Sequence, residues 1–472
     1  AFVVVAKHGM GIRPVMPVGR LPVRRLQTLH LRSRSIALQA LVNVIVVVTS
    51  LVLGGVATLT LAWMLYAWRS PDGLAATRFS RGDATSVRRL RFSLLVPARH
   101  EDQVLGHTLD GLAAVDHPDV EIICIVGHDD DATAAVAHEA AARHPGRVKV
   151  VVDHSWPKNK PKALNTALPH CTGDVVGVFD AEDEVSPELL RAIETTFHTD
   201  RADVVQGGVQ LMNVRSSWWA LRNCLEYFFW FRSRLHFHAD RDFIPLGGNT
   251  VFVRTELLRA VGGWDAECLA EDCELGVRLS SLGAWVSVAY EPALATREET
   301  PGSIGSLVKQ RTRWDQGFLQ VLRKGEWRGL PTARQRLLAR YTLLTPTIQA
   351  ITGLLVPVSL LLILFAETPT VITLVGFLPL MLVVASVAVE VVALHEFGRE
   401  FDVRVGPRQY VGLVLGTMPY QWLLAFAAVR AVVRERRGDT SWEKTAHVGA
   451  HRAAAPELVV DLRDGRRGRV AP

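Results

Sequence analysis

The sequence has few cysteines and little charge for its length. Only 21% of its 472 residues are charged and 49% are hydrophobic, which is apolar for a soluble enzyme. The five cysteines form no CxxC pair and no His/Cys ligand spacing. We therefore expect no disulfides and no structural zinc, and a reducing compartment for the polar half of the chain. No small-residue cleavage pattern follows the first apolar run, so we expect no secretory signal.

The net charge of +6 comes mostly from arginine, and the basic residues cluster beside hydrophobic segments. That arrangement fits anionic lipid headgroups and the positive-inside tendency of membrane proteins. A nucleic-acid-binding protein would instead gather its basic residues on one soluble face. We expect membrane lipids, and not nucleic acid, as partners.

Apolar runs predict membrane segments on both sides of a central domain. Residues 1–35 form a basic tail, and the uncharged residues 36–68 are long for one span and short for two. We favour one long helix, with a hairpin at Gly54-Gly55 as the alternative. Residues 341–432 contain three more apolar segments, and residues 433–472 form a cytoplasmic or disordered tail.

The third of these segments, residues 410–432, is interrupted by Gly416 and Pro419. If it crosses the membrane, the arginines after it lie opposite the catalytic half; if it is bent or re-entrant, they stay on the same side. The sequence leaves both open. Glu390 lies near the end of the second segment, and we interpret it as snorkelling to the headgroups rather than marking a polar path.

Residues 88–325 alternate short apolar runs with amphipathic ones, which is typical of a parallel α/β fold. We predict strands at residues 91–98, 120–126, 147–152 and 174–179. Ligands bind at the carboxyl ends of such strands. Asp180 and the cluster Asp129-Asp130-Asp131 follow two of these ends.

Residues 214–237 combine many aromatic side chains, seven of them between Trp218 and Phe231, with four interleaved arginines. This mixture favours a helix at the headgroup level of a membrane. A sugar-stacking surface for an acceptor is the alternative, and both roles are compatible.

Two acidic motifs are candidates for the chemistry. Asp180-Ala181-Glu182-Asp183 follows an apolar strand, and its carboxylates suit a hard divalent cation beside phosphate oxygens, although an acidic helix cap has the same composition. Glu271-Asp272 begins a predicted helix, and one of these carboxylates suits a general base; the other interpretation is an acidic first turn that the helix dipole favours.

Three further motifs suit binding of a phosphorylated ligand. Lysines at 160 and 162 precede a predicted helix, Gly247-Gly248-Asn249 allows close approach of backbone, and Gln310 to Trp314 (QRTRW) combines phosphate-binding arginines with a stacking ring. A solvated basic loop, a turn and a basic membrane-surface helix are the corresponding structural alternatives.

In this order the motifs resemble those of membrane-embedded family 2 glycosyltransferases, the group of cellulose, hyaluronan and poly-N-acetylglucosamine synthases. The resemblance covers about residues 91–314 and the spans that follow, and QxxRW before spans is its most specific part. It implies a GT-A (Rossmann-like) α/β fold with flanking transmembrane helices.

The resemblance also implies roles by position. Asp180 and Glu182 would hold Mg²⁺ or Mn²⁺, with Asp183 a rival for the second place, and Asp272 would be the general base. The donor nucleotide would contact Pro97, Ala98, Arg99, Glu101, Asp129, Asp130, Lys162 and Asp180. The diphosphate and the acceptor would contact Gly248, Asn249, Glu271, Gln310, Arg311, Arg313 and Trp314.

The implied activity is inverting transfer from a nucleotide-diphosphate sugar, with UDP expected, to build a β-linked polysaccharide at the plasma membrane with a cytoplasmic catalytic domain. Three departures stand out: DAE in place of DxD, AED in place of TED, and no gating loop like that of the cellulose synthases. The alternatives are single transfer to a lipid or short glycan acceptor and, in another class, a transporter or channel with a non-catalytic soluble domain.

Overall fold

The computed structural model of the protein describes residues 23–68, 89–443 and 448–452, with side chains from residue 37 onward. Most of the predicted basic tail, residues 1–35, and the residues from 453 on lie outside these ranges.

A seven-stranded mixed sheet forms the centre of the fold, in the order β3-β2-β1-β4-β7-β5-β8. Its strands are β1 (Phe92–Ala98), β2 (Val120–Gly127), β3 (Val148–Asp153), β4 (Val175–Val178), β5 (Val204–Gly207), β7 (Val251–Arg254) and β8 (Val286–Ala289). The first four are parallel and confirm the predicted strands. The antiparallel β7, which lies between β4 and β5, was not predicted. A second, two-stranded sheet pairs β6 (Val209–Leu211) with β9 (Thr296–Glu298).

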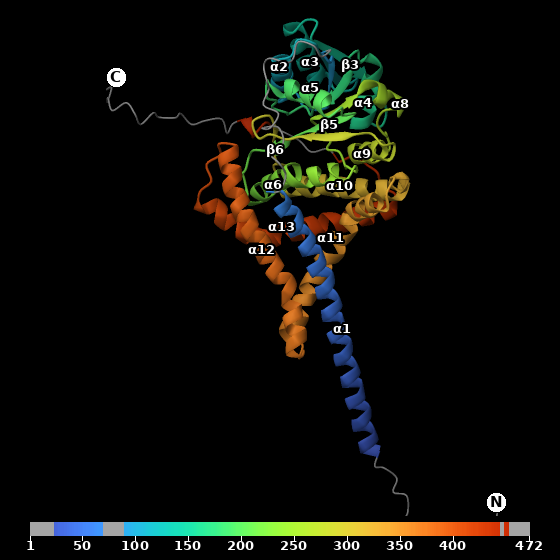
Figure 1. The fold of residues 1–472 in the computed structure, drawn as a ribbon, viewed down its shortest axis with the longest axis vertical. Coiled ribbons are helices and arrows are strands. Elements are labelled where there is room, and N and C mark those ends of the chain that lie inside the picture. Colours follow the sequence, from blue (N-terminus) through green and yellow to red (C-terminus); the bar gives the residue numbers. More distant parts are fainter. Residues whose placement is uncertain (1–22, 69–88, 444–447, 453–472) are drawn as a thin grey trace, which may run out of the picture.

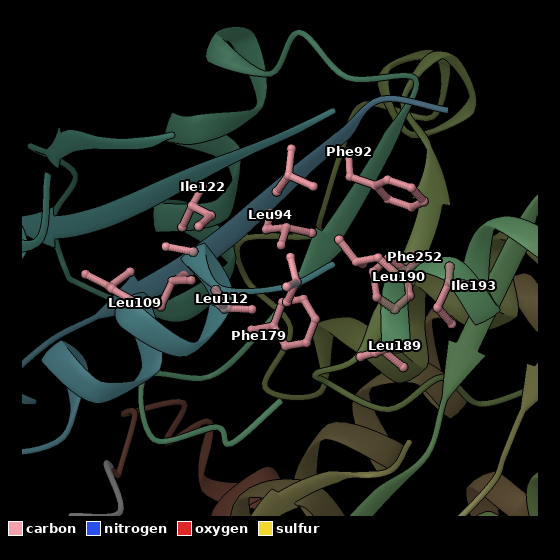
Figure 2. Packing of buried hydrophobic residues seen from close by; sticks show 14 of the residues in the cluster. Phe92, Leu94, Leu109, Leu112, Ile122, Phe179, Leu189, Leu190, Ile193 and Phe252 are labelled. Carbon is pink, nitrogen blue, oxygen red and sulfur yellow. The ribbon is translucent and has the colours of Figure 1, made fainter. Parts of the chain in front are cut away.

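Helices cover both faces of the large sheet because alternate strand residues point to opposite sides. Helices α2 (Leu105–Ala113), α3 (Asp131–Arg143) and α5 (Leu189–Thr199) pack on one face, over a cluster that includes Phe92, Leu94 and Phe252 (Figure 2). Helices α4 (Lys160–Ala167), α8 (Thr255–Ala260) and α9 (Glu271–Ser281) pack on the other. Short 3-10 turns span Leu168–His170 and Glu326–Gly329.

Two amphipathic elements lie across the lower side of this domain (Figure 1). One is α6 (Trp218–Phe229), continued by a π-helical turn (Trp230–Arg234) and α7 (Leu235–Ala239); the other is α10 (Ile304–Lys324). This supports an interfacial position for the aromatic segment. Its arginines, however, are not solvated: Arg222 and Arg232 form ion pairs with carboxylates of α12.

Within the described residues, four helices are long and apolar enough to cross a membrane: α1 (Val23–Tyr66), α11 (Ala333–Phe365), α12 (Thr370–Glu400) and α13 (Pro407–Arg437). Helix α1 is continuous, which confirms one helix over a hairpin at Gly54-Gly55. Helices α1, α11 and α12 extend away from the sheet domain (Figure 1).

Helix α13 returns to the sheet domain at both ends. Just before it, the carbonyl of Arg404 accepts hydrogen bonds from Arg215, which precedes α6. At its other end, Glu435 pairs with Arg323 of α10 at 2.6 Å, and the carbonyl of Asp439 accepts a hydrogen bond from Gln316 of α10 at 2.7 Å. Both ends of the helix therefore lie beside the sheet domain. The helix lies under the domain, so the arginines after it stay on the side of the sheet.

The interpretation of Glu390 as a snorkelling side chain was wrong. Its carboxylate accepts two hydrogen bonds from the guanidinium of Arg222, at 2.5 and 2.9 Å, and its side chain is only 16% exposed. A buried cation on α6 stabilises this carboxylate.

Candidate active site

One cavity of about 1100 Å³ lies between the carboxyl ends of the strands and the apolar helices. Most of the predicted site residues line it, from all the motifs: Pro97, Ala98, Arg99, Glu101, Lys162, Asp180, Glu182, Gly248, Asn249, Glu271, Asp272, Gln310, Arg311, Arg313 and Trp314. The predicted residues Asp129, Asp130 and Asp183 lie outside its lining.

Asp180 and Asp272 face each other across Lys160 and Gly248. Lys160 Nζ contacts Asp180 Oδ1 and donates a hydrogen bond to the carbonyl of Gly248 at 2.8 Å. A Cβ at position 248 would lie 3.1 Å from Asp272 Oδ2 and 3.6 Å from Lys160 Nζ. Glycine at 248 therefore keeps the space in which the two carboxylates and the ammonium meet.

The sequence offered both Lys160 and Lys162 for a phosphorylated ligand, and the family resemblance assigned the donor contact to Lys162. Residues two positions apart on a helix point about 200° apart, so only one of the two lysines faces the carboxylates. Lys160 begins α4 and points inward, whereas Lys162 Nζ lies 3.7 Å from the exposed Glu267 at the rim. The signal available in the sequence was the N-cap Asn159, which fixes where the helix starts and so which lysine turns inward.

The charges at this end of the cavity depend on one another. Burial alone would lower the pKa of Lys160, but Asp180, Glu271 and Asp272 raise it above its usual value. Burial, and then the charge of Asp272, raises the pKa of Glu271 to about 7, and burial also raises the pKa of Asp272. A carboxylate whose pKa is raised toward neutral pH is suited to accept a proton.

Asp183 is held in the wall behind Asp180. Its carboxylate accepts hydrogen bonds from the N–H of Asp180 at 2.8 Å and from Asn249 Nδ2 at 3.2 Å, and Asn249 also contacts Glu298. Burial, followed by the charges of Glu298, Asp180 and Glu182, raises the pKa of Asp183 well above its usual value. Asn249 thus links the predicted GGN motif to the acidic motif, and Glu298 is a further carboxylate of the site that sequence patterns did not reveal.

Helix α10 brings QRTRW to the cavity from the membrane side. A Cβ at Gly317 would lie 2.6 Å from the backbone N of Ala270, so this glycine allows α10 to pack directly against the turn before Glu271 and Asp272. Gln320 fixes the same contact by accepting a hydrogen bond from the N–H of Leu269 at 2.9 Å.

The two arginines of this motif face different neighbours. Burial lowers the pKa of Arg313, and the charges of Glu271, Asp180 and Asp272 oppose that shift. Arg311 instead pairs with Glu226 of α6 at 2.7 Å and lies 4.7 Å from the ring centroid of Trp314. Arg311 therefore joins Trp314 to α6, whereas Arg313 is the arginine that the charges of Asp180, Glu271 and Asp272 act on; both line the cavity.

The donor end is lined by the ends of β1 and β3. Pro97, Ala98 and Arg99 line the cavity as predicted, and Arg99 pairs with Asp129 at 3.0 Å. Asp130 instead caps α3, accepting the N–H of Thr133 at 3.3 Å. Asp153, at the end of β3, lines the cavity and was missed, although its place after an apolar strand was the same signal used for Asp180.

The segment after α13 covers part of this site, although the sequence analysis found no loop of this kind. Trp442 lines the cavity, with the guanidinium of Arg313 4.5 Å from its ring centroid. Further on, Arg452 donates to the carbonyl of Glu182 at 2.9 Å and to Thr108 Oγ1 at 2.7 Å. The carboxylate of Glu299 accepts hydrogen bonds from the N–H groups of residues 448–450. The C-terminal segment is thus attached at the acidic motif itself.

The same cavity continues to the apolar helices. Its lining at that end includes polar side chains of α1, α11, α12 and α13, namely Thr60, Thr345, Gln349, Glu390 and Gln421. The cavity therefore runs from the carboxyl ends of the sheet strands to the apolar helices.

Comparison with known proteins agrees with this geometry. The sequence model of the family described as "Glycosyltransferase like family 2" matches residues 89–317. The chain is 28% identical over 278 residues to a β-monoglucosyldiacylglycerol synthase of Synechocystis, covering 55% of this chain and 56% of that protein. It is 25% identical over 269 residues to a poly-β-1,6-N-acetyl-D-glucosamine synthase of Staphylococcus epidermidis, covering 55% and 61%. The chain thus spans little more than half the length of these curated relatives.

Among solved structures, a mannosyltransferase from Pyrobaculum calidifontis, in complex with GDP-Man and Mn²⁺, aligns with a TM-score of 0.52 and 17% identity. The alignment covers 83% of this chain and 99% of that one. At this identity the likeness concerns the fold, which is the GT-A fold with candidate membrane helices beside it. Residues 89–317 therefore match a family 2-like glycosyltransferase domain, and the curated relatives that the chain resembles are named as glycosyltransferases.

Proposed function

We propose that the protein is an inverting, divalent-metal-dependent transferase that moves a sugar from a UDP-sugar to a hydroxyl of an acceptor carried in the membrane. The observation that supports this most is the single cavity that joins Asp180, Lys160, Asp272 and Arg313 to the membrane helices. The catalytic domain would face the cytoplasm at the plasma membrane, where nucleotide sugars are available.

Asp180 and Glu182 are the residues that would hold Mg²⁺ or Mn²⁺. Both line the cavity at the end of β4, and carboxylate oxygens suit hard divalent ions. Within the described ranges no cluster of three or more His, Cys, Asp or Glu side chains suited to a metal occurs, so diphosphate oxygens and water would complete the coordination. When bound, the ion would supply positive charge to the leaving diphosphate.

Asp183 is the weaker candidate for the second metal ligand. It lies outside the cavity lining and its oxygens accept hydrogen bonds from Asn249 and the backbone of Asp180. A carboxyl group with a raised pKa in such a position supports the loop and is poorly suited to bind a cation.

The transfer itself needs one base and a neutralised leaving group. Asp272 would take the proton of the acceptor hydroxyl. At the same time the acceptor oxygen would form a bond to the anomeric carbon of the donor sugar, and the bond between that carbon and the diphosphate would break. Lys160 and Arg313 lie beside the carboxylates and would stabilise the departing diphosphate. Attack from the face opposite the leaving group converts an α-linked donor to a β-linked product.

A lipid is the acceptor that we favour, because the cavity ends among apolar helices and reaches Trp63 near the end of α1. A growing β-linked polysaccharide is the second candidate. The polar side chains that all four apolar helices contribute to the lining favour it, since they suit a hydroxyl-rich chain.

The test incubates the full-length protein in native membranes with a panel of labelled UDP- and GDP-sugars, with and without a chelator, and sizes the products. We expect chelator-sensitive transfer from one UDP-sugar, lost in Asp272→Asn. A single addition to a lipid-extractable product supports the lipid acceptor, and a ladder or polymer supports the second candidate. Transfer that survives the chelator, or that Asp272→Asn leaves intact, contradicts the proposed mechanism.

A further inference from the structure

The membrane end of the cavity contains an arginine without a counter-charge. Arg234, the last residue of the π-helical turn after α6, lines the cavity. Its neighbours Arg222, Arg232 and Arg311 each pair with a carboxylate. Among the described residues, no acidic side chain pairs with Arg234, and its buried Nε has no hydrogen-bond partner. A partly buried cation of this kind is costly unless an anion is supplied from elsewhere.

Two tryptophans hold this guanidinium in place. Its carbon atom lies 4.1 Å from the ring centroid of Trp63 and 5.0 Å from that of Trp230. Cation–π contacts fix its orientation but leave its N–H groups available for a ligand.

Further polar atoms around it also lack partners in the part of the chain that the structure describes. They are Nε1 of Trp63, which is 8% exposed, and both ring nitrogens of His238, which is fully buried. The ring centroids of Trp63 and His238 are 6.4 Å apart. Buried polar groups are almost always hydrogen-bonded. Arg234 and Trp63 line the cavity, so their unpartnered N–H groups suit a polar ligand there, whereas the fully buried His238 lies outside the lining.

The position along the spans places this site at the level of lipid headgroups. Trp63 lies three residues before the end of α1, and its ring is 5.5 Å from that of Tyr341, where the apolar run of α11 begins. Tryptophan and tyrosine at the ends of spans mark the boundary between hydrocarbon and headgroups.

This arginine is distinct from those at the donor end. Burial lowers the pKa of Arg234 to about 10, and the only groups that oppose this shift are Tyr341 and Glu226. The carboxylates Asp180, Glu271 and Asp272 act on Arg313 instead. The donor diphosphate therefore has its own cations, and Arg234 is left for another anion.

We infer that Arg234, held between Trp63 and Trp230, binds the phosphate of an anionic membrane lipid at the membrane end of the cavity. A guanidinium matches phosphate with two parallel hydrogen bonds, and phosphate is the anion that lipids present at this depth. The inference goes beyond the proposed transfer and does not depend on which sugar or acceptor is used.

The test measures lipid binding by the full-length protein in a phosphate-free maltoside detergent. The probe is phosphatidylglycerol, and the comparators are diacylglycerol, which has the same acyl chains without phosphate, and inorganic phosphate. Native mass spectrometry reads retained lipid, and thermal denaturation reads the shift in Tm. We expect phosphatidylglycerol, but neither comparator, to be retained and to raise Tm, with at least tenfold lower retention in Arg234→Gln.

Arg241→Gln is the matched control. Arg241 is an exposed arginine shortly after α7, and its guanidinium carbon lies 3.5 Å from the ring centroid of Phe237. Without lipid, Arg234→Gln should unfold at the same temperature as the wild type or higher, since it removes an uncompensated cation. Asp272→Asn should retain lipid normally, which separates this site from the proposed transfer.

Incubation with the donor then distinguishes two sources of the phosphate. A retained lipid that gains the mass of one sugar is the acceptor, and one that stays unchanged is a resident lipid; both support the site. Equal retention by Arg234→Gln and wild type, equal retention of diacylglycerol, or saturation by inorganic phosphate in place of lipid would overturn it.

Discussion

The two ends of the cavity use charge in opposite ways. At the donor end, Asp180, Glu271 and Asp272 crowd around Lys160 and Arg313, and several of these groups have shifted pKa values. At the membrane end, Arg222–Glu390 and Arg311–Glu226 are closed bidentate pairs. Surplus carboxylates at the first end are available for a metal and a proton, whereas the pairs at the second end join helices. Arginine, lysine and carboxylate side chains therefore suit catalysis where their charges are not paired one to one, and they stabilise helix packing where each charge has its partner.

The largest effect on activity should come from substituting Glu182 and Asp183 one at a time, which tells which of them is the second metal ligand. We expect Glu182→Ala to reduce kcat by about a hundredfold or more and to raise the Mn²⁺ concentration needed, because a ligand is lost. Asp183→Asn should stay within about tenfold of wild type, since Asp183 lies outside the cavity lining and the amide oxygen can still accept the hydrogen bond from the N–H of Asp180. Initial rates across a Mn²⁺ titration measure both, and the reverse order would make Asp183 the ligand.

The next effect distinguishes the two lysines of α4. Lys160→Ala should lower kcat by about tenfold to a hundredfold, because it removes the ammonium between Asp180 and Gly248. Lys162→Ala should change kcat less than about threefold, as its ammonium lies at the rim beside Glu267. Steady-state kinetics on both variants decide, and a larger loss in Lys162→Ala would restore the assignment made from sequence.

A closed pair at the membrane end should affect stability more than chemistry. Glu390→Ala leaves Arg222 buried without its partner, so we expect a loss of about 3 kcal/mol in stability with kcat largely kept in the folded fraction. The double variant Arg222→Met with Glu390→Leu should recover most of the loss, because it removes both charges. Thermal denaturation in detergent measures this, and a kcat that collapses while Tm is unchanged would show that the pair takes part in catalysis.

The smallest effect is a shift in pH dependence at the donor end. The base must be deprotonated to act, so activity should fall as the pH drops through the raised pKa values of Glu271, about 7, and Asp272. Glu271→Gln removes a negative charge beside Asp272 and should lower the pKa of Asp272. The acidic limb of the pH–activity profile should then move to lower pH. The pH profile of kcat/KM measures the shift, and a limb that moves to higher pH would contradict the coupling.

Local sequence patterns were enough to place most of the sheet domain. The four parallel strands were located to within about one residue, because continuous apolar runs of this length belong to strands buried on both faces. Arg99 after β1, Asp180 after β4 and QRTRW line one cavity, since carboxyl ends of parallel strands meet at one edge of a sheet, whereas Asp129 and Asp130 after β2 lie outside its lining. The antiparallel β7 was missed because its four residues carry no signal of direction.

The sequence by itself determined the α/β domain, the long apolar helices and the set of residues suited to the chemistry, because these depend on the periodicity of hydrophobic residues and on residue type. Tertiary structure alone decided which lysine turns toward Asp180, that Glu390 pairs with Arg222, that α13 stays under the domain, and that Arg452 reaches back to the acidic motif. These facts rest on contacts between residues far apart in the chain, and the free energy of such contacts depends on the packing around them, which no local pattern records.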